Sequence, residues 1–467
     1  MLFQRIESEG LAHYSYIVGD HNEAFVIDPR RDVDVYLETA SHNGYRIRYV
    51  LETHRHEDFV TGSLELAVQA EAELWHADTQ WDYRFGQGVR DRQTWEVGRL
   101  RLQAIHAPGH TPGLMCYLLY DSEGVPWILF SGDVLFAGDV GRMDLMGLER
   151  LPEMAGLMYD TLFNRILQLD DGTIICPAHG FGSICGASIV DRPWTTIGLE
   201  RKYNPRLHYT DRSAFIAAAQ LLERPPYFNR MESLNTEGPP LLGTLPAPVP
   251  LMPDSFAARR DHGFLLDTRM ELGFGAAHIP GALSIWLKGL PVFAGWFVPY
   301  ERPILMINER DDDAERAVRY LIRLGYDNIE ARLAGDMLAW HKSGRESQTV
   351  AMVKVQDLCR RLDADEHIWI LDVRSQEELD EEGSIPGAHH IPITHILDHI
   401  DEIPKDRSAY VICSSGLCSM IIISLLQDKG WNNLVEVLGG VAGWRSKSCD
   451  MGANSLHLAK HSMKQTK

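Results

Sequence analysis

Histidine and aspartate side chains follow several short apolar runs in the first half of the chain. His54, His56 and Asp58 stand at every second position of one loop, and His110 and Asp133 lie in two later loops. Imidazole and carboxylate groups are the usual ligands of zinc and non-haem iron. A single loop histidine is most often structural, but the joint pattern predicts a metal site.

Four short apolar runs precede these loops, and the last of them leads to His179. The runs comprise residues 49–51, 102–105, 127–130 and 173–176. Each run is bounded by a polar loop, as buried strands are, and loops on a rigid scaffold are where ligands converge. We therefore expect one edge of the sheets to assemble the metal site.

The order of the motifs in these loops resembles the metallo-β-lactamase superfamily. The motifs are Thr53-His-x-His-x-Asp58, Pro108-Gly-His-Thr-Pro-Gly113, Ser131-Gly-Asp133 and Pro177-Ala-His-Gly180. The resemblance covers roughly residues 1–230 and implies an αββα sandwich that holds its metal at the sheet edges. These motifs indicate the fold more specifically than the reaction.

Residue 59 separates two reaction classes within this superfamily. Dinuclear members, such as glyoxalase II hydrolases, carry a second-site histidine there, whereas this chain has Phe59, which offers no lone pair. A mononuclear site is therefore favoured. Resemblance to the persulfide dioxygenase branch implies the ligands His54, His110 and Asp133. This set leaves positions open on Fe(II), one ion per chain, for substrate and O₂.

The other polar residues of these loops would then lie close to the metal. His56 would orient a water or the substrate beside it, unless the site holds zinc and His56 remains a ligand. Asp58 and His179 are also expected near the metal. Arg142 and Asp144 occur at the spacing of this branch. They either brace the metal loop through hydrogen bonds or form an ion pair that supports the loop alone.

The second half of the chain repeats itself at an offset of about 105 residues. The repeated pairs are Asp267-Thr-Arg269 with Asp372-Val-Arg374, Ile279-Pro-Gly281 with Ile385-Pro-Gly387, and Gly335 and Trp340 with Gly440 and Trp444. Short β-rich runs alternate with helical segments in each copy, which predicts parallel α/β sheets. A proline-rich segment, residues 237–253, predicts a linker ahead of the first copy.

We therefore expect a multidomain α/β chain of three domains followed by a short tail. The tail shows little apolar periodicity and is expected to be disordered. The boundaries are 1–240 for the metal domain, 241–348 and 349–450 for the two copies, and 451–467 for the tail.

One cysteine of the second copy stands where its thiol would be activated. Cys413 ends an apolar run, and a helix is expected to start near Ser419, so backbone N–H groups and the helix dipole would stabilise an anionic sulfur. This copy resembles a rhodanese sulfurtransferase domain, in which Cys413 would be the nucleophile.

The loop after Cys413 departs from the rhodanese pattern. Rhodaneses often carry arginines there, whereas this chain has Ser414 and Cys418, which argues against thiosulfate as the preferred sulfur donor. Cys418 is either a resolving thiol for Cys413 or a buried residue at the helix start.

The first copy has Asn308 at the position of Cys413, followed by the acidic run 309–313. Because it lacks a thiol and would repel an anionic persulfide, we expect this rhodanese-like copy to be inactive. Its role would be that of a spacer, a docking face or an interface between subunits of a homo-oligomer. Three cysteines of the metal domain are expected to pack in the core: Cys116, Cys176 and Cys185.

The net charge of −20, from 45 basic and 65 acidic residues, argues against a nucleic-acid or anionic-membrane binder. The 7 cysteines are too few and too scattered for a disulfide framework. Because no secretory segment and no bilayer-spanning apolar run is found, we expect a cytoplasmic protein.

Together these resemblances imply a persulfide dioxygenase fused to tandem rhodanese domains, active in sulfide detoxification. The first domain would oxidise a low-molecular-weight persulfide, of glutathione or a similar thiol, with O₂ to sulfite and the thiol. Cys413 would move sulfane sulfur to or from sulfite and thiosulfate. The alternatives are a glyoxalase II-like zinc thioester hydrolase and a non-oxidative sulfur carrier or sensor.

Overall fold

The computed structural model describes residues 1–364 and 366–446. The chain divides into two compact units, Met1–Pro246 with Arg319–Asp327, and Ala247–Val318 with Asn328–Lys467. The tail predicted over 451–467 lies outside the described residues. None of the described helices has the length and apolar character needed to cross a bilayer.

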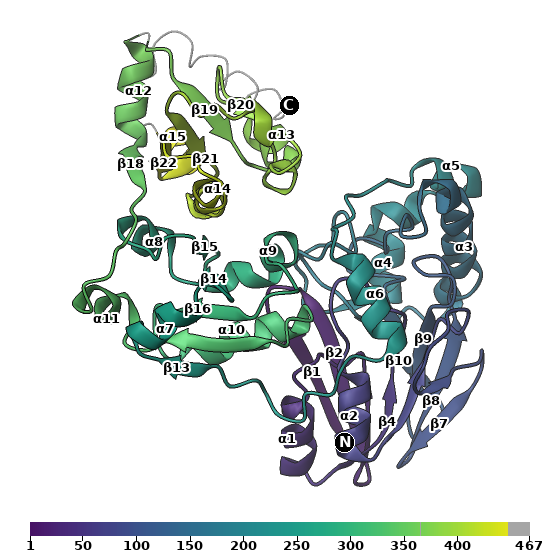
Figure 1. Ribbon diagram of the computed structural model, residues 1–467. Helices are drawn as coiled ribbons and strands as arrows, with labels where there is room; N and C mark the ends of the chain where they lie inside the picture. The colour runs from purple at the N-terminus through teal and green to yellow at the C-terminus, as the bar shows by residue number, and fades with distance from the viewer. Residues whose placement is uncertain (365, 447–467) are drawn as a thin grey trace. The chain divides into compact units, whose positions relative to one another are not determined.

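Two six-stranded sheets form the centre of the first unit (Figure 1). The first consists of β1 (Leu2–Ser8), β2 (His13–Asp20), β3 (Glu23–Ile27), β4 (Arg46–Leu51), β5 (Glu73–His76) and β6 (Gln87–Gly88). The second consists of β7 (Thr94–Val97), β8 (Leu100–His106), β9 (Met115–Tyr120), β10 (Pro126–Gly132), β11 (Ile174–Pro177) and β12 (Thr195–Thr196). Phe25 of the first sheet and Phe130 of the second belong to one buried cluster, so the sheets pack face to face.

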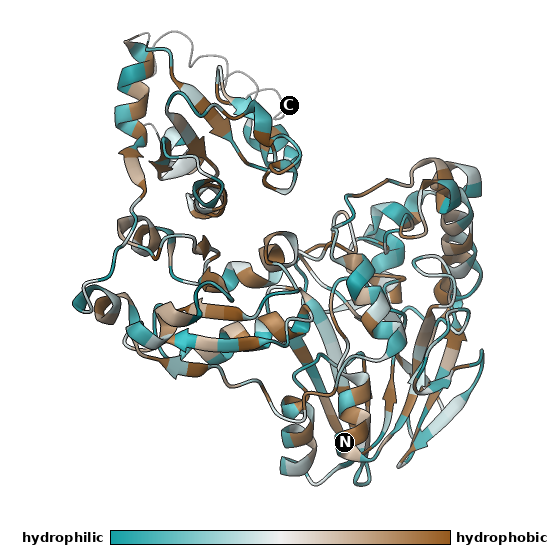
Figure 2. Ribbon diagram, viewed as in Figure 1, coloured by the Kyte–Doolittle hydropathy of each residue, from teal (hydrophilic) through white to brown (hydrophobic). Residues whose placement is uncertain are grey.

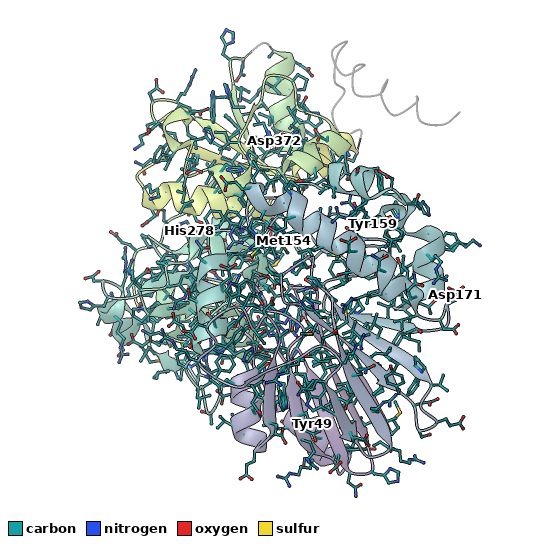
Figure 3. The ribbon with its side chains drawn as sticks, turned by 90° about the vertical axis from the view of Figure 1, so that its right-hand side faces the viewer. Tyr49, Met154, Tyr159, Asp171, His278 and Asp372 are labelled. Carbon is teal, nitrogen blue, oxygen red and sulfur yellow. The ribbon has the colours of Figure 1, made fainter. Side chains whose placement is uncertain are left out.

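Helices cover the outer faces of both sheets. The helices α1 (Asp34–His42) and α2 (Ser63–Ala70) share a buried cluster with the first sheet. Helix α3 (Leu151–Asn164) packs on the second, and its Met154 and Tyr159 are labelled in Figure 3. The remaining helices of this unit are α4 (Ile197–Tyr203), α5 (Arg212–Ala217) and α6 (Phe228–Glu237). This arrangement confirms the predicted αββα sandwich.

The strands that precede the candidate ligand loops are the expected ones. They are β4, β8, β10 and β11, and Figure 2 shows β10 largely in the brown of apolar residues. Strands β10 and β11 are parallel neighbours, with Phe130 opposite Cys176. The loops after both strands therefore leave the sheet at the same edge.

The second unit contains two five-stranded parallel sheets with the same strand order. The first has the order β13 (Val249–Leu251), β17 (Ile329–Leu333), β16 (Ile304–Ile307), β14 (Phe264–Asp267) and β15 (Leu283–Ser284). The second has the order β18 (Ala351–Lys354), β22 (Leu434–Leu438), β21 (Ala409–Ile412), β19 (Trp369–Asp372) and β20 (His389–His390). The shared order confirms that one α/β domain is duplicated.

Each of these sheets carries its own helices. In the first copy they are α7 (Pro253–Arg259), α8 (Glu271–Ala276), α9 (Leu290–Phe297), α10 (Asp313–Arg323) and α11 (Asp336–Lys342). In the second copy they are α12 (Val355–Asp363), α13 (Gln376–Glu382), α14 (Leu417–Asp428) and α15 (Gly440–Arg445). Val355, Leu358 and Val441 of these helices share a buried cluster with Ile412 of β21.

The segment predicted as a linker over 237–253 is partly folded. Helix α6 ends at Glu237, and β13 already pairs with β17 from Val249. Pro250 lies in β13, which is an edge strand, and a proline is tolerated there because one side of such a strand makes no ladder bonds. The irregular connection is therefore shorter than the proline content suggests.

Candidate functional site

His54 follows β4, and its neighbours fix the orientation of its ring. The Thr53 hydroxyl donates to Asp28 at 2.7 Å and therefore accepts from Nδ1 of His54, 2.9 Å away. The Nε2 atom is buried and has no hydrogen-bond partner among the described residues. A neutral imidazole held in this way directs its lone pair at a metal ion.

His110 is oriented by the loop that follows β10. Its Nδ1–H donates to the carbonyl of Arg142 at 2.8 Å, and its buried Nε2 has no partner within the described part of the chain. Gly141 permits this close approach, because a Cβ there would collide with the carbonyl of Asp133. His110 thus presents the same ring nitrogen as His54.

The two ring nitrogens converge on the carboxylate of Asp133. Its Oδ2 lies 3.7 Å from Nε2 of His54 and 3.4 Å from Nε2 of His110. Ligand atoms about 2.1 Å from a tetrahedral metal are separated by roughly 3.4 Å. Burial opposes ionisation, but His179 and His54 hold the pKa of the Asp133 carboxyl well below its usual range. The structure thus brings the three expected ligands together, and they fit one metal ion.

His179 lies between two carboxylates. Its Nδ1 is 2.8 Å from Oδ1 of Asp133, and its Nε2 is 3.1 Å from Oδ2 of Asp58. Burial disfavours the imidazolium, but Asp133 and Asp58 raise the pKa of His179 well above its ordinary value. Both ring nitrogens of His179 therefore face carboxylates, one of them that of the candidate ligand Asp133.

His56 faces Asp28. Its Nε2 lies 3.2 Å from Oδ1 of Asp28, and its ring centroid is 4.2 Å from that of His54. Burial opposes a charge on this ring, but Asp28 raises the pKa of His56 above the ordinary value. His56 therefore lies beside the three converging ligands, with its ring held by a carboxylate on the other side.

Phe59 fills the place where a second-site histidine would stand. The ring is fully buried, with its centroid 4.1 Å from that of His13 and 4.6 Å from that of His56. His13 was not predicted. It starts β2, its Nδ1 lies 3.0 Å from the Ser8 hydroxyl, and its ring is 5.5 Å from that of His179. No motif or spacing in the sequence marks this residue.

Cys185 lies at the site as well as in the core. It packs against Phe136 and Ile189, as expected of a core cysteine. Its Sγ also lies within 4.8 Å of ligand atoms of Asp58 and His179. Burial raises the pKa of this thiol far above its ordinary value. Its position soon after the Pro177-Ala-His-Gly motif was the signal that the sequence offered.

Glu57 was also missed. It is fully buried, its Oε2 lies 3.8 Å from Nε2 of His110, and its Oε1 lies 3.6 Å from Arg55. Burial raises the pKa of this carboxyl well above its usual range. Glu57 stands between His56 and Asp58 in its motif. Because side chains at successive positions of an extended segment alternate in direction, the sequence predicts that the Glu57 side chain points away from the ligands.

Arg142 and Asp144 combine the two roles that were considered for them. The Nε and Nη2 atoms of Arg142 donate to Asp144 at 2.7 and 2.8 Å, and both side chains are buried. Arg142 also donates to the carbonyl of Leu222 at 3.0 Å. Because the Arg142 carbonyl accepts from His110, this ion pair supports the loop that orients a ligand.

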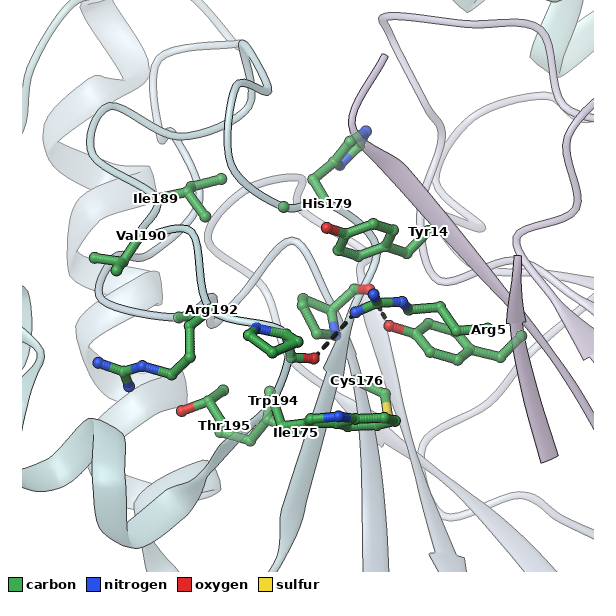
Figure 4. A pocket seen from close by; sticks show the side chains of 15 residues that line it. Arg5, Tyr14, Ile175, Cys176, His179, Ile189, Val190, Arg192, Trp194 and Thr195 are labelled. Carbon is green, nitrogen blue, oxygen red and sulfur yellow. Dashed lines mark hydrogen bonds between the residues drawn. The ribbon is translucent and has the colours of Figure 1, made fainter. Parts of the chain in front are cut away.

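A small pocket lies next to His179 (Figure 4). Its wall includes Tyr14, Trp194 and Arg5, whose guanidinium lies 4.2 Å from the centroid of the Tyr14 ring. Arg5 also donates to the carbonyl of Pro193 at 3.1 Å, which fixes its position. The pocket thus places a fixed cation against an aromatic wall.

The second site is built around Cys413, directly after β21. The N–H of Gly416 donates to its Sγ at 3.0 Å, and the Ser419 hydroxyl lies 3.5 Å away. Gly440, at φ +52°, lets the chain pass close to the backbone of Cys413, because a Cβ there would collide with the Cys413 carbonyl. Hydrogen bonds from Cys418, Ser419 and Gly416 outweigh burial and lower the pKa of Cys413 to about 6. The thiolate therefore predominates at neutral pH.

Cys418 lies in the first turn of α14, and its thiol is the largest influence that lowers the pKa of Cys413. The hydrogen bond with Cys413, together with burial, raises the pKa of Cys418 far above its ordinary value. Cys418 is thus a neutral donor to its neighbour. The contact suits either of the two roles considered for it.

The first copy has a different side chain at the corresponding place. Asn308 follows β16 and is buried, and its Nδ2 donates to the Thr268 hydroxyl at 2.9 Å. The amide thus forms a structural hydrogen bond in the position that the thiolate occupies in the second copy.

Comparison with protein families agrees with the division of the chain. Residues 9–179 match the model of the metallo-beta-lactamase superfamily, and residues 252–343 and 354–447 each match that of the rhodanese-like domain. A solved structure, a metallo-beta-lactamase from Staphylococcus aureus, is 28% identical with a TM-score of 0.63, and the match covers 72% of this chain and 98% of that one.

Curated relatives of the first domain fall into two reaction classes. The persulfide dioxygenase ETHE1 of Bos taurus is 28% identical over 207 residues, which is 42% of this chain and 71% of the relative. The hydroxyacylglutathione hydrolase GloC of Haemophilus influenzae is 26% identical over 219 residues, 42% of this chain and 92% of the relative. Identity alone does not separate the two classes.

Proposed function

The chain joins a metallo-beta-lactamase domain to two rhodanese-like domains, and on this premise we propose that it is a persulfide dioxygenase and sulfurtransferase of sulfide detoxification. The first reaction is R–S–SH + O₂ + H₂O → R–SH + SO₃²⁻ + 2 H⁺. The observation that carries it is the geometry of the metal centre. Three donor atoms converge, whereas Phe59 offers no donor atom to a second metal and both ring nitrogens of His179 face carboxylates.

The residues of the metal centre have separate tasks. His54, His110 and Asp133 hold one Fe(II), which supplies the redox chemistry toward O₂ when bound. The imidazolium of His179 holds Asp133 in place and balances part of its charge. Buried Phe59 packs against His56 and keeps bulk water away from the site.

The pocket beside His179 supports an anionic carrier thiol. Arg5 is held against Tyr14 and the Pro193 carbonyl, so its guanidinium is already positioned to bind a carboxylate such as that of glutathione. Because the whole chain is acidic, with a net charge of −20, this local cation supplies the attraction that the overall field does not.

The second reaction takes place at Cys413. Its thiolate attacks the outer sulfur of a persulfide, so that Cys–S⁻ + R–S–SH gives Cys–S–SH + R–S⁻. The S–S bond of the donor breaks as the new S–S bond forms, and no external oxidant is needed. After loss of its proton, the cysteine persulfide passes its outer sulfur to sulfite, which gives thiosulfate and regenerates the thiolate.

Metal content and O₂ uptake test the proposal. Anaerobically purified protein should contain one iron per chain and consume O₂ only when a persulfide such as that of glutathione is supplied. The His110→Ala variant should lose iron and O₂ uptake but still accept sulfur on Cys413. Two zinc ions with thioester cleavage would instead identify a hydrolase, and O₂ uptake that survives His110→Ala would remove the dioxygenase assignment.

A non-oxidative sulfur carrier is the remaining possibility. In that case persulfidation of Cys413 would proceed, but neither iron nor persulfide-dependent O₂ uptake would be found. The same two measurements therefore distinguish all three functions.

A further inference from the structure

A buried carboxyl group lies one hydrogen bond away from the Cys413 loop. Glu436 is in β22, next to β21, and its side chain is fully buried. Its Oε1 is 2.8 Å from the hydroxyl of Ser419, which is itself 3.5 Å from Sγ of Cys413. Its Oε2 has no hydrogen-bond partner among the described residues. Among the ion pairs of the described residues, none involves Glu436.

The two copies differ at all three members of this chain of groups. At the offset of about 105 residues, the positions of Cys413, Ser419 and Glu436 hold Asn308, Ala314 and Ala331. Ala314 and Ala331 are buried, so the fold of this domain needs neither the hydroxyl nor the carboxyl. The acid and the hydroxyl occur together with the thiol, which points to a role in the chemistry of the sulfur.

The charge state of Glu436 follows from its surroundings. Two anions cannot share a buried site at low cost, so a thiolate at Cys413 favours a protonated carboxyl at Glu436. Burial, and then the negative charge of Cys413, raise the pKa of Glu436 well above its usual range. Glu271 of α8 in the first copy acts in the same direction. No described cation opposes them, and the other facing groups are Ser419 and Cys418 of α14.

The direction of the hydrogen bonds depends on this proton. A serine hydroxyl has one proton to donate. If Glu436 is ionised, it draws that proton to itself. If Glu436 is protonated, it donates to Ser419 and leaves the serine proton for another acceptor. The Gly416 carbonyl, 3.0 Å away, competes for it, but an anionic sulfur is the acceptor that gains more from a hydrogen bond.

We propose that Glu436 is a positioning residue for sulfur transfer: as a neutral acid it donates to Ser419, whose hydroxyl then donates to the anionic sulfur of Cys413. This inference rests on the proposed role of Cys413 as the sulfur carrier. The outer sulfur of the Cys413 persulfide also carries negative charge. The Ser419 hydroxyl therefore stabilises both the thiolate before the transfer and the persulfide anion after it.

The pH profile of Cys413 alkylation tests the proposal in the full chain. Iodoacetamide labelling of the Cys413 peptide, measured by mass spectrometry, should rise in two steps. The first follows ionisation of Cys413. The second, at higher pH than the first, follows ionisation of Glu436, when Ser419 turns away and the sulfur becomes more nucleophilic. In Glu436→Gln the second step should be lost, because the amide keeps donating to Ser419 at every pH.

Two further variants complete the test. Ser419→Ala should also lose the second step and should shift the first step upward by about one pH unit, since one hydrogen bond to the thiolate is gone. Glu378→Gln, which changes the carboxylate bonded to Ser414, should keep both steps. A Glu436→Gln profile that superimposes on the wild-type profile overturns the proposal, as does a Ser419→Ala profile with two steps.

A separate measurement tests the proposed sulfur transfer, independently of the alkylation profiles. Mass spectrometry after incubation with glutathione persulfide shows whether wild-type Cys413 gains a sulfur. Absence of that sulfur refutes the carrier role, whereas the alkylation profiles report on Glu436 through the thiol alone.

Discussion

The metal centre and the Cys413 loop handle buried charge in different ways. At the metal centre, buried Nε2 atoms of His54 and His110 face a carboxylate, and neither nitrogen has a partner in the described chain. At Cys413 the negative sulfur accepts hydrogen bonds from the chain itself, among them the N–H of Gly416. The first site leaves two buried nitrogens for a cation to bind, whereas the second has its donors within the folded chain.

The Cys413→Ser variant should produce the largest separation between the two sites. Sulfur transfer to sulfite should fall to background, because a serine hydroxyl neither ionises at neutral pH nor forms a persulfide. Persulfide-dependent O₂ uptake should remain. The measurement is thiosulfate formation and O₂ consumption on the same preparation.

The first rhodanese-like copy provides the control for that variant. Asn308→Ser changes the equivalent position, which has no thiol, and should leave both activities unchanged. Enzymatic thiosulfate formation that persists in Cys413→Ser would show that the reacting thiol lies elsewhere.

Removal of the metal should act on one site alone. Bound metal at about 1,000 times its Kd stabilises the folded state by about 4 kcal/mol, so a chelator should lower the melting temperature of the metal domain by roughly 10 °C. Cys413 needs no ion, so its alkylation rate should not change. A chelator that slows alkylation of Cys413 would contradict the contrast between the two centres.

The fold, and the convergence of His54, His110 and Asp133, could be predicted from the sequence because their signals are local. Apolar runs followed by a loop that carries His54 or His110 specify both a strand and the loop after it, and the offset between the copies fixes a second domain. Glu436 could not be predicted, since a glutamate in an apolar run gives no sign of the hydroxyl that meets it from α14. His13 is brought to the site by its pairing with His179, which no local pattern encodes.

Asp144→Asn should have a smaller effect, confined to the metal centre. Arg142 would lose its charged partner, and the carbonyl that orients His110 would be held less firmly. Loss of such support commonly costs 10- to 100-fold in metal affinity or activity. Metal titration checks the affinity. Asp160→Asn, in the exposed pair with Arg212, should change nothing, because exposed pairs contribute little.

Cys418→Ala should give the smallest effect and would sharpen the view of Cys413 as a site completed by the chain. Cys418 is the leading donor that lowers the pKa of Cys413 to about 6, so its loss should raise that pKa. Alkylation of Cys413 should then slow several-fold near pH 6 and match the wild type near pH 9, where the thiol is ionised in both. Ser415→Ala, at an exposed position of the same loop, should leave the profile unchanged.

The same change should appear in the free energy of unfolding, with a definite sign. A thiol whose pKa falls on folding stabilises the native state above its unfolded value of 9.0, and this contribution disappears as the pH falls through about 6. The stability difference between wild type and Cys418→Ala should therefore grow from pH 6 to pH 9, beyond any constant packing cost. A difference that stays constant with pH would mean that Cys418 only fills space at the start of α14, and that the remaining hydrogen bonds activate Cys413 without it.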